Sequence, residues 1–255
     1  MKNILITICG RAGSKGFKNK NLKTFLGVPL VYYTAAIAED FKTRMKKECC
    51  TTICLNTDSK ELQNIVHTKY SDIAIIDRSA ELGGDKVPKS AVWRNSLNLL
   101  ESKLGLAFDY VIDLDITSPL RQINDVVDAF NLKLHNSQYQ MIYSVCESRR
   151  NPYFNMVKVE NGFATEFCPS KYTTRQDAPS VYDMNASIYV MDASALRYDI
   201  EDQIFATSKM GIYEMYDTAV LDIDCEQDFE LMEIIAKYLY EKRESFRQVQ
   251  TLAMT

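Results

Sequence analysis

The 255-residue chain is 46% hydrophobic and 25% charged, a balance typical of a globular protein with one α/β core and a modest appendage. Its formal net charge of −4 disfavours a protein that wraps nucleic acid, because such proteins usually carry a basic excess. No run of eighteen apolar residues predicts a transmembrane helix, and the short apolar run after Met1 lacks the features of a signal peptide. We therefore expect a cytoplasmic protein with neither a nucleic-acid nor a membrane partner.

Strands and helices alternate through the first half of the chain. The apolar run of residues 4–8, which ends before Gly10, predicts a buried strand, and further strands are expected at 51–55, 73–76, 110–114 and 141–145. Between them, helices are expected from Pro29, after the capping segment 56–59, over 89–104 and over about 123–134. The helix over 89–104 is expected to be amphipathic, with Leu104 on its apolar, inward face. This order is typical of a doubly wound, mainly parallel α/β sheet with helices on both faces.

The pattern changes after residue 147. Residues 154–159 and 163–167 alternate around Asn161-Gly162, which predicts a hairpin. Short strands are expected at 187–191, 212–215 and 220–223, and a long helix over 226–242, with its apolar face inward. We interpret residues 1–255 as one domain with a small β-rich insertion at about 147–180.

The seven cysteines and two histidines give no metal-binding pattern. The cysteine number is odd, none forms a CxxC pair, and four lie in strand-like apolar runs, which predicts buried, reduced thiols. With only His67 and His135, a His/Cys zinc site is not expected.

A glycine-rich basic loop follows the first strand, where an open parallel sheet places its ligands. Three glycines allow backbone N–H groups to surround phosphate oxygens, and four cations suit a triphosphate: Gly10, Gly13, Gly16, Arg11, Lys15, Lys18 and Lys20. The spacing fits neither a Walker A motif nor GxGxxG.

Two acidic pairs follow apolar runs further along the chain. Asp113 and Asp115 should project to one side at the end of a strand, ahead of Thr117-Ser118-Pro119, which can cap the next helix. Asp222 and Asp224 are likewise two residues apart, and hard oxygen ligands of this kind suit Mg²⁺; helix capping by Asp224 is the alternative. A basic loop and acidic pairs on one sheet edge predict metal-assisted phosphoryl or nucleotidyl transfer, with base and acceptor unspecified.

The sequence resembles the acylneuraminate cytidylyltransferases, or CMP-sialic acid synthetases. The matching motifs follow the family's order across nearly the whole chain: Arg11 with Ser14-Lys15-Gly16 and Lys20-Asn21-Leu22, Asn56-Thr57-Asp58, Arg78 with Glu81, Leu82 and Asp85, Thr117–Arg121, Arg175–Pro179, Asn185–Tyr189 and Asp222–Asp224.

The resemblance implies a Rossmann-like nucleotidyltransferase fold, usually dimeric through the insertion, and transfer of CMP from CTP to an acidic nine-carbon sugar. The implied nucleotide-binding residues are Arg11, Ser14, Lys15, Lys20, Asn21, Arg78 and Asp85. The implied acceptor residues are Asp115, Arg175, Asn185 and Tyr189. Mg²⁺, with Mn²⁺ as a substitute, is expected on Asp222, Asp224 and Asp115, and the catalytic residues are expected to be Arg11, Lys20, Asp222 and Asp224.

Several positions depart from the sialic-acid enzymes. Asp115 stands where they typically have Gln and Asp183 where they tend to have Arg, and residues 149–155 differ as well. The chain thus most resembles the bacterial CMP-legionaminic acid synthetase branch, which favours a legionaminic-type acceptor, with N-acetylneuraminate next. The alternatives are a CMP-Kdo synthetase-like enzyme and a catalytically silent nucleotide-binding sensor.

Overall fold

The computed structural model describes residues 1–13, 16–84, 86–198, 209–220 and 222–255. Ser14, Lys15 and Asp85, three of the expected nucleotide-binding residues, therefore lie outside the described residues.

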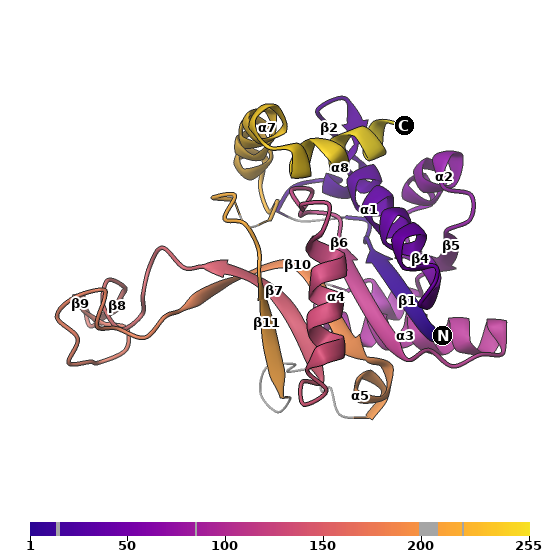
Figure 1. Cartoon of the computed structure of the whole chain (residues 1–255). Coiled ribbons are helices and arrows are strands. Elements are labelled where there is room, and N and C mark those ends of the chain that lie inside the picture. The colour runs from indigo at the N-terminus through magenta and orange to yellow at the C-terminus, as the bar shows by residue number, and fades with distance from the viewer. Residues whose placement is uncertain (14–15, 85, 199–208, 221) are drawn as a thin grey trace.

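A seven-stranded sheet with the order β11-β7-β10-β6-β1-β4-β5 forms the centre of the molecule (Figure 1). All neighbouring strands pair in parallel except β10, which is antiparallel to both β6 and β7. The strands are β1 (Lys2–Cys9), β4 (Cys49–Thr57), β5 (Ala74–Asp77), β6 (Tyr110–Asp115), β7 (Met141–Glu147), β10 (Tyr182–Asp192) and β11 (Met210–Glu214). The expected mainly parallel α/β sheet is confirmed.

Helices cover both faces of the sheet, and a hydrophobic core lies between the sheet and the helices on each face. Strand β1 therefore contributes alternate side chains to two separate cores. Ile4, Ile6 and Ile8 belong to the larger core, whereas Leu5 belongs to the smaller one. The larger core is closed by α1 (Leu30–Met45), α2 (Lys60–Lys69), α4 (Asp125–His135), α7 (Glu226–Lys242) and α8 (Glu244–Met254). The smaller core is closed by α3 (Lys89–Leu104) and α5 (Ala193–Tyr198).

The strand order reverses beside β1. The chain passes from β1 through β4 to β5 on one side, and then returns to place β6 on the other side of β1. The carboxyl ends of β1 and β6 meet there, with Cys9 opposite Asp115 in the register. Such a reversal leaves a crevice at the carboxyl edge of an open sheet, where α/β proteins place their ligands.

Four further short elements lie outside the central sheet, and two of them, the 3₁₀ helices, contribute residues to its carboxyl edge. The 3₁₀ helix η1 (Lys20–Leu22) ends the glycine-rich loop, and η2 (Ala80–Leu82) follows β5. Between η1 and α1, β2 (Thr24–Phe25) and β3 (Val28–Pro29) form a two-residue ladder.

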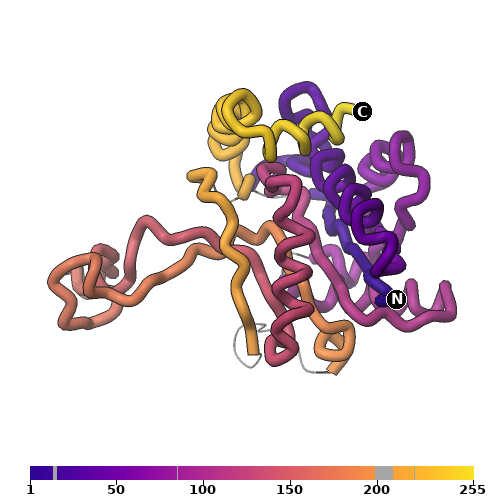
Figure 2. Tube along the Cα trace, viewed as in Figure 1, coloured from indigo at the N-terminus to yellow at the C-terminus, as the bar shows by residue number. Residues whose placement is uncertain are grey.

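The predicted hairpin forms an arm that extends away from the sheet (Figures 1 and 2). Its strands are β8 (Val157–Glu160) and β9 (Phe163–Glu166). Asn161 and Gly162 join them with positive φ angles of 54° and 83°, a conformation that an Asn-Gly hairpin turn supplies at little strain. All eight strand residues are exposed.

Four sequence predictions are wrong. Residue 220 and residues 222–223 are not in a strand, because Ala219 turns the chain at φ 66° and the Ile223 amide donates to Thr117 outside any ladder. Thr117–Pro119 do not cap a helix, because α4 begins only at Asp125. The amide and the hydroxyl of Thr117 donate to the carboxylate of Asp115 instead. Leu104, expected inside, is 45% exposed at the end of α3. All seven cysteines are free, but Cys50 and Cys225 are exposed.

Candidate active site

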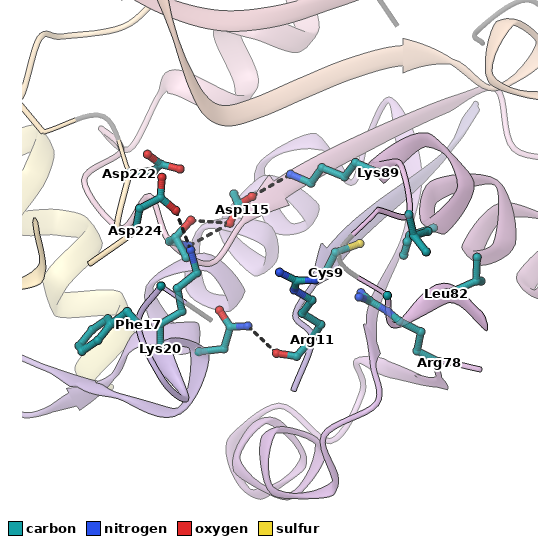
Figure 3. A pocket seen from close by; sticks show the side chains of 16 residues that line it. Cys9, Arg11, Phe17, Lys20, Arg78, Leu82, Lys89, Asp115, Asp222 and Asp224 are labelled. Atoms are coloured by element: carbon teal, nitrogen blue, oxygen red, sulfur yellow. Dashed lines mark hydrogen bonds and ion pairs between the residues drawn. The ribbon is translucent and has the colours of Figure 1, made fainter. Parts of the chain in front are cut away.

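A cavity of about 650 Å³ occupies the carboxyl edge of the sheet at the reversal (Figure 3). It is lined by the loop after β1, the segment from β5 to α3, the end of β6 and the turn before α7. The sixteen lining residues are Cys9, Arg11, Gly16, Phe17, Lys20, Asn21, Arg78, Leu82, Gly84, Val87, Lys89, Val92, Asp115, Thr117, Asp222 and Asp224.

The glycine-rich loop brings two cations and an amide to the cavity. The side-chain amide of Asn21, which is 8% exposed, donates to the carbonyl oxygen of Arg11 at 3.1 Å and so fixes the fold of the loop. Lys20 extends from η1 toward the turn before α7, whereas the exposed Lys18 does not line the cavity.

Gly16 allows this loop to touch the acidic turn. A Cβ at Gly16 would lie 2.7 Å from the carbonyl oxygen of Asp224, a separation that side chains do not tolerate. Lys20 ties the same two segments together, donating to the Ile223 carbonyl at 2.7 Å and pairing with the Asp224 carboxylate at 3.1 Å. The basic loop and the acidic pair, some 200 positions apart in sequence, are therefore in direct contact.

Asp222 and Asp224 both line the cavity but differ in their partners. Asp224 pairs with Lys20, and it does not cap α7, because the Asp228 carboxylate accepts the Asp224 and Cys225 amides at that end. No donor from the described residues reaches the Asp222 carboxylate. Burial, and then the nearby carboxylates of Asp224 and Asp115, raise the pKa of Asp222 to about 6. A bound cation would relieve this crowding of negative charge, so the donor set fits a hard divalent ion.

Asp115 faces the same cavity with its carboxylate already engaged. Its Oδ1 accepts the amide and hydroxyl of Thr117 at 3.0 and 2.8 Å, and its Oδ2 pairs with the Lys89 ammonium at 2.8 Å. Burial would raise the pKa of Asp115, but Lys89 and Thr117 together hold it well below its usual range. The expected set of three metal ligands is not formed, since nowhere in the described ranges do three His, Cys, Asp or Glu side chains group closely enough to hold an ion.

Arg78 closes the cavity on the side opposite the aspartates (Figure 3). It is 9% exposed and is held by Asn56, whose side-chain oxygen accepts from Nε at 2.8 Å and whose carbonyl accepts from Nη2 at 2.7 Å. Asn56 in turn donates to Ser96 of α3 at 2.9 Å. The guanidinium is thus fixed in place at the cavity wall.

The other expected acceptor residues do not line this cavity. Tyr189 is 7% exposed and lies under Lys89, with the ammonium 4.9 Å from its ring centre. Asn185 is buried and accepts from the Ser144 hydroxyl at 2.6 Å. Arg175 is exposed in the segment between the arm and β10 and donates to the Ser148 carbonyl at 3.0 Å.

Sequence reasoning missed Lys89 as a site residue. It is the first residue of α3, and a cation in the first turn of a helix opposes the helix dipole. A lysine at this position does not stabilise the helix, and this could have indicated from the sequence that Lys89 has another role. Phe17, Leu82, Val87 and Val92 also line the cavity, but the sequence carries no signal that separates them from ordinary apolar residues.

Comparison with known proteins yields relatives over nearly the whole chain. The cytidylyltransferase family model matches residues 5–252. The chain is 35% identical over 237 residues to post-translational flagellin modification protein B of Campylobacter coli, covering 93% of this chain and 96% of that protein. It is 34% identical over 235 residues to CMP-N,N'-diacetyllegionaminic acid synthase of Campylobacter jejuni, and this match covers 92% of this chain and 95% of that protein.

A solved structure of CMP:2-keto-3-deoxy-manno-octonic acid synthetase in complex with CTP shares the fold. It superposes with a TM-score of 0.65, covering 93% of this chain and 99% of the other. At 15% identity, that likeness concerns the fold alone.

Proposed function

This chain belongs to the cytidylyltransferase family, and we propose that it transfers CMP from CTP to the anomeric hydroxyl of a nonulosonic acid, releasing pyrophosphate. The observation that carries the proposal is the contact between the glycine-rich loop and the Asp222–Asp224 turn at one cavity. The relatives that cover more than nine-tenths of the chain support an acceptor of this class, since one is named for a legionaminic acid.

CTP binds with its triphosphate against the loop. Arg11 and Lys20 supply the positive charge, and Asn21 holds the loop in shape. Ser14 and Lys15, which lie outside the described residues, are assigned to the nucleotide by their sequence motif alone. Arg78, fixed by Asn56, takes the nucleoside end on the opposite side of the cavity. Asp85, outside the described residues, is assigned to the nucleotide by its sequence motif alone. Placing the α-phosphorus between these anchors makes attack by a bound hydroxyl effectively unimolecular.

Asp222 and Asp224 hold the divalent ion, Mg²⁺ with Mn²⁺ as a substitute. When bound, the ion offsets charge on the departing pyrophosphate. Lys20, which contacts Asp224 and the Ile223 carbonyl, keeps the turn in place and adds positive charge beside the phosphates.

Asp115 selects the acceptor. An ionised carboxylate accepts about four hydrogen bonds and donates none, and three acceptor positions are used by Lys89 and Thr117. The remaining position suits an N–H or O–H donor of the sugar. A diacetylated legionaminic acid has two acetamido N–H groups, so we rank this sugar above N-acetylneuraminate.

The active enzyme is a homodimer. The arm exposes seven large apolar side chains, a concentration typical of a protein–protein contact: Tyr153, Phe154, Met156, Val157, Val159, Phe163 and Phe167. A second copy that covers these side chains would also bring its Arg175 toward the acceptor side of the cavity. A planar guanidinium is suited to the carboxylate of the sugar acid.

The deciding experiment crosses CTP, UTP, ATP and GTP with N,N'-diacetyllegionaminic acid, N-acetylneuraminate and Kdo, and measures pyrophosphate release with Mg²⁺. We expect release with CTP only, fastest with the legionaminic acid and absent with Kdo. A nucleotide-binding sensor would bind CTP in calorimetry and release no pyrophosphate with any sugar. Fastest turnover with Kdo would favour the CMP-Kdo synthetase alternative.

A further inference from the structure

The site has two acidic pairs, and among the described residues one of these pairs includes a carboxylate that receives no hydrogen bond. Asp222 receives no hydrogen bond from the described residues, whereas Asp113 and Asp115 share the ammonium of Lys89, with 2.8 Å to Oδ2 of each. Lys89 thus stands between two carboxylates, where a metal ion bridging them would otherwise stand.

The ammonium of Lys89 is held on several sides. Asp113 is fully buried and also accepts the Thr7 hydroxyl at 2.7 Å, so its carboxylate cannot turn away. Asp115 is fixed through its other oxygen by Thr117. The ammonium lies 4.9 Å from the ring centre of Tyr189 and 5.7 Å from that of Trp93, distances at which aromatic faces attract cations. Lys89 still lines the cavity, with 29% of its side chain exposed.

Two-metal enzymes of phosphoryl transfer use paired carboxylates to hold ions about 3.5–4 Å apart. In this chain one pair already holds a cation that belongs to the protein. We propose that Lys89 is a built-in counter-ion that takes the place of a second metal ion on Asp113 and Asp115, so that the site binds one divalent ion, on Asp222 and Asp224. This inference rests on the proposed function for its catalytic meaning, but it concerns the number of ions the folded protein binds.

The test counts bound Mn²⁺ per chain by electron paramagnetic resonance, with Mn²⁺ alone and no nucleotide. Lys89→Met removes the ammonium but keeps a long side chain, and it should bind one more Mn²⁺ than the wild type. Adding Asp115→Asn to this variant should remove the extra ion. Lys89→Arg keeps the positive charge and should show the wild-type count. An unchanged count in folded Lys89→Met, as judged by circular dichroism, would overturn the proposal.

A second measurement does not depend on the folding of the Lys89 variants. Asp115→Asn alone should leave the wild-type Mn²⁺ count unchanged, because Lys89 and not a metal ion occupies this carboxylate. Loss of a bound ion in this variant would identify Asp115 as a metal ligand and overturn the proposal. Pyrophosphate release by the same wild-type preparation tests the proposed function separately, since a silent protein would still give an ion count.

Discussion

At the scale of single residues, the acidic turn before α7 holds two carboxylates in different environments. Asp224 is mostly exposed and pairs with Lys20, whereas Asp222 is half-buried, has no donor among the described residues and has a raised pKa. Keeping the Asp222 carboxylate ionised at this position costs free energy while no cation is bound, because burial and the neighbouring negative charges both disfavour its ionised form. Residues arranged at such a cost are typical of a binding site and not of a structural surface.

Replacing Asp224 by Asn removes a metal-ligating charge without changing the size of the side chain. We expect turnover to fall by more than about 100-fold, the upper end of what loss of an outer-shell metal partner costs. The fold should be retained, because Asp224 is exposed and the cap of α7 comes from Asp228. Initial rates of pyrophosphate release and thermal melting check both statements.

Glu226→Gln is the matched control, since this exposed acid lies two residues further on and outside the cavity. It should retain near-wild-type rates. Near-wild-type turnover in Asp224→Asn would mean that the metal assignment is wrong.

At the scale of elements, the connection from β6 to α4 fixes the end of the strand that carries Asp115. Arg121, 1% exposed, donates to the carbonyls of Asp115 at 2.6 Å and Ser187 at 2.8 Å. Asp125 then begins α4 and accepts the Gln122 amide at 2.6 Å and the Tyr213 hydroxyl at 3.1 Å. The position of Asp115 therefore depends on packing between β6, β10 and the start of α4.

The start of α4 gives a pH dependence of stability. Burial raises the pKa of Asp125 from 3.8 to about 6, although the Gln122 and Tyr213 hydrogen bonds oppose the shift. Folding therefore favours the protonated form of Asp125. The contribution of this carboxyl group to the free energy of unfolding is fully present below about pH 4 and is lost as the pH rises through 6. We expect the free energy of unfolding of the wild type to fall by about 2–3 kcal/mol more than that of Asp125→Asn between pH 4 and 8.

Urea denaturation at fixed protein concentration measures this difference. Asp128→Asn is the control, because it changes an exposed acid in the same helical turn and should follow the wild type. Parallel pH profiles for wild type and Asp125→Asn would contradict the prediction.

At the scale of the whole molecule, the hairpin arm of β8 and β9 extends away from the central sheet (Figure 2). Val159 and Phe163 are each 74% exposed, on the two strands of the hairpin. Burying such side chains against a second copy would stabilise the dimer by roughly 1.5–3 kcal/mol for each side chain. None of the described helices is long and apolar enough to cross a membrane.

The register pairs Val159 with Ala164 and Phe163 with Glu160, so these two side chains lie on opposite faces of the hairpin. The double variant Val159→Lys, Phe163→Glu therefore places a charge on each face and should convert a dimer into a monomer, because charges are costly to bury in an apolar contact. Light scattering coupled to size-exclusion chromatography measures the mass. The variant should lose most turnover if Arg175 of a second copy serves the acceptor. Lys158→Ala and Glu160→Ala, which alter an exposed ion pair on the same hairpin, are the controls. A wild-type monomer with full activity would refute the proposed assembly.

Local patterns in the sequence were enough to define most elements. The 16-residue α3 and the 17-residue α7 have the expected bounds, since caps and apolar spacing act within a few residues. The hairpin follows from Asn161 and Gly162, which accept positive φ. The first part of β10 escaped prediction, because Ala186, at φ 51°, shifts the register between Met184 and Tyr189 and breaks the alternation.

The features of the candidate site also divide into those that the sequence predicted and those that only the tertiary structure decided. Its basic loop and acidic pairs were recognisable in the sequence, because charged residues directly after apolar strands stand out from their surroundings. The partner of each charge was decided only by the tertiary structure: Lys20 for Asp224, Lys89 for Asp113 and Asp115, and no described donor for Asp222. Ion pairs and close backbone contacts, such as that of Gly16 with Asp224, join residues far apart in the chain. Their geometry depends on how the strands are ordered, and no local pattern contains that information.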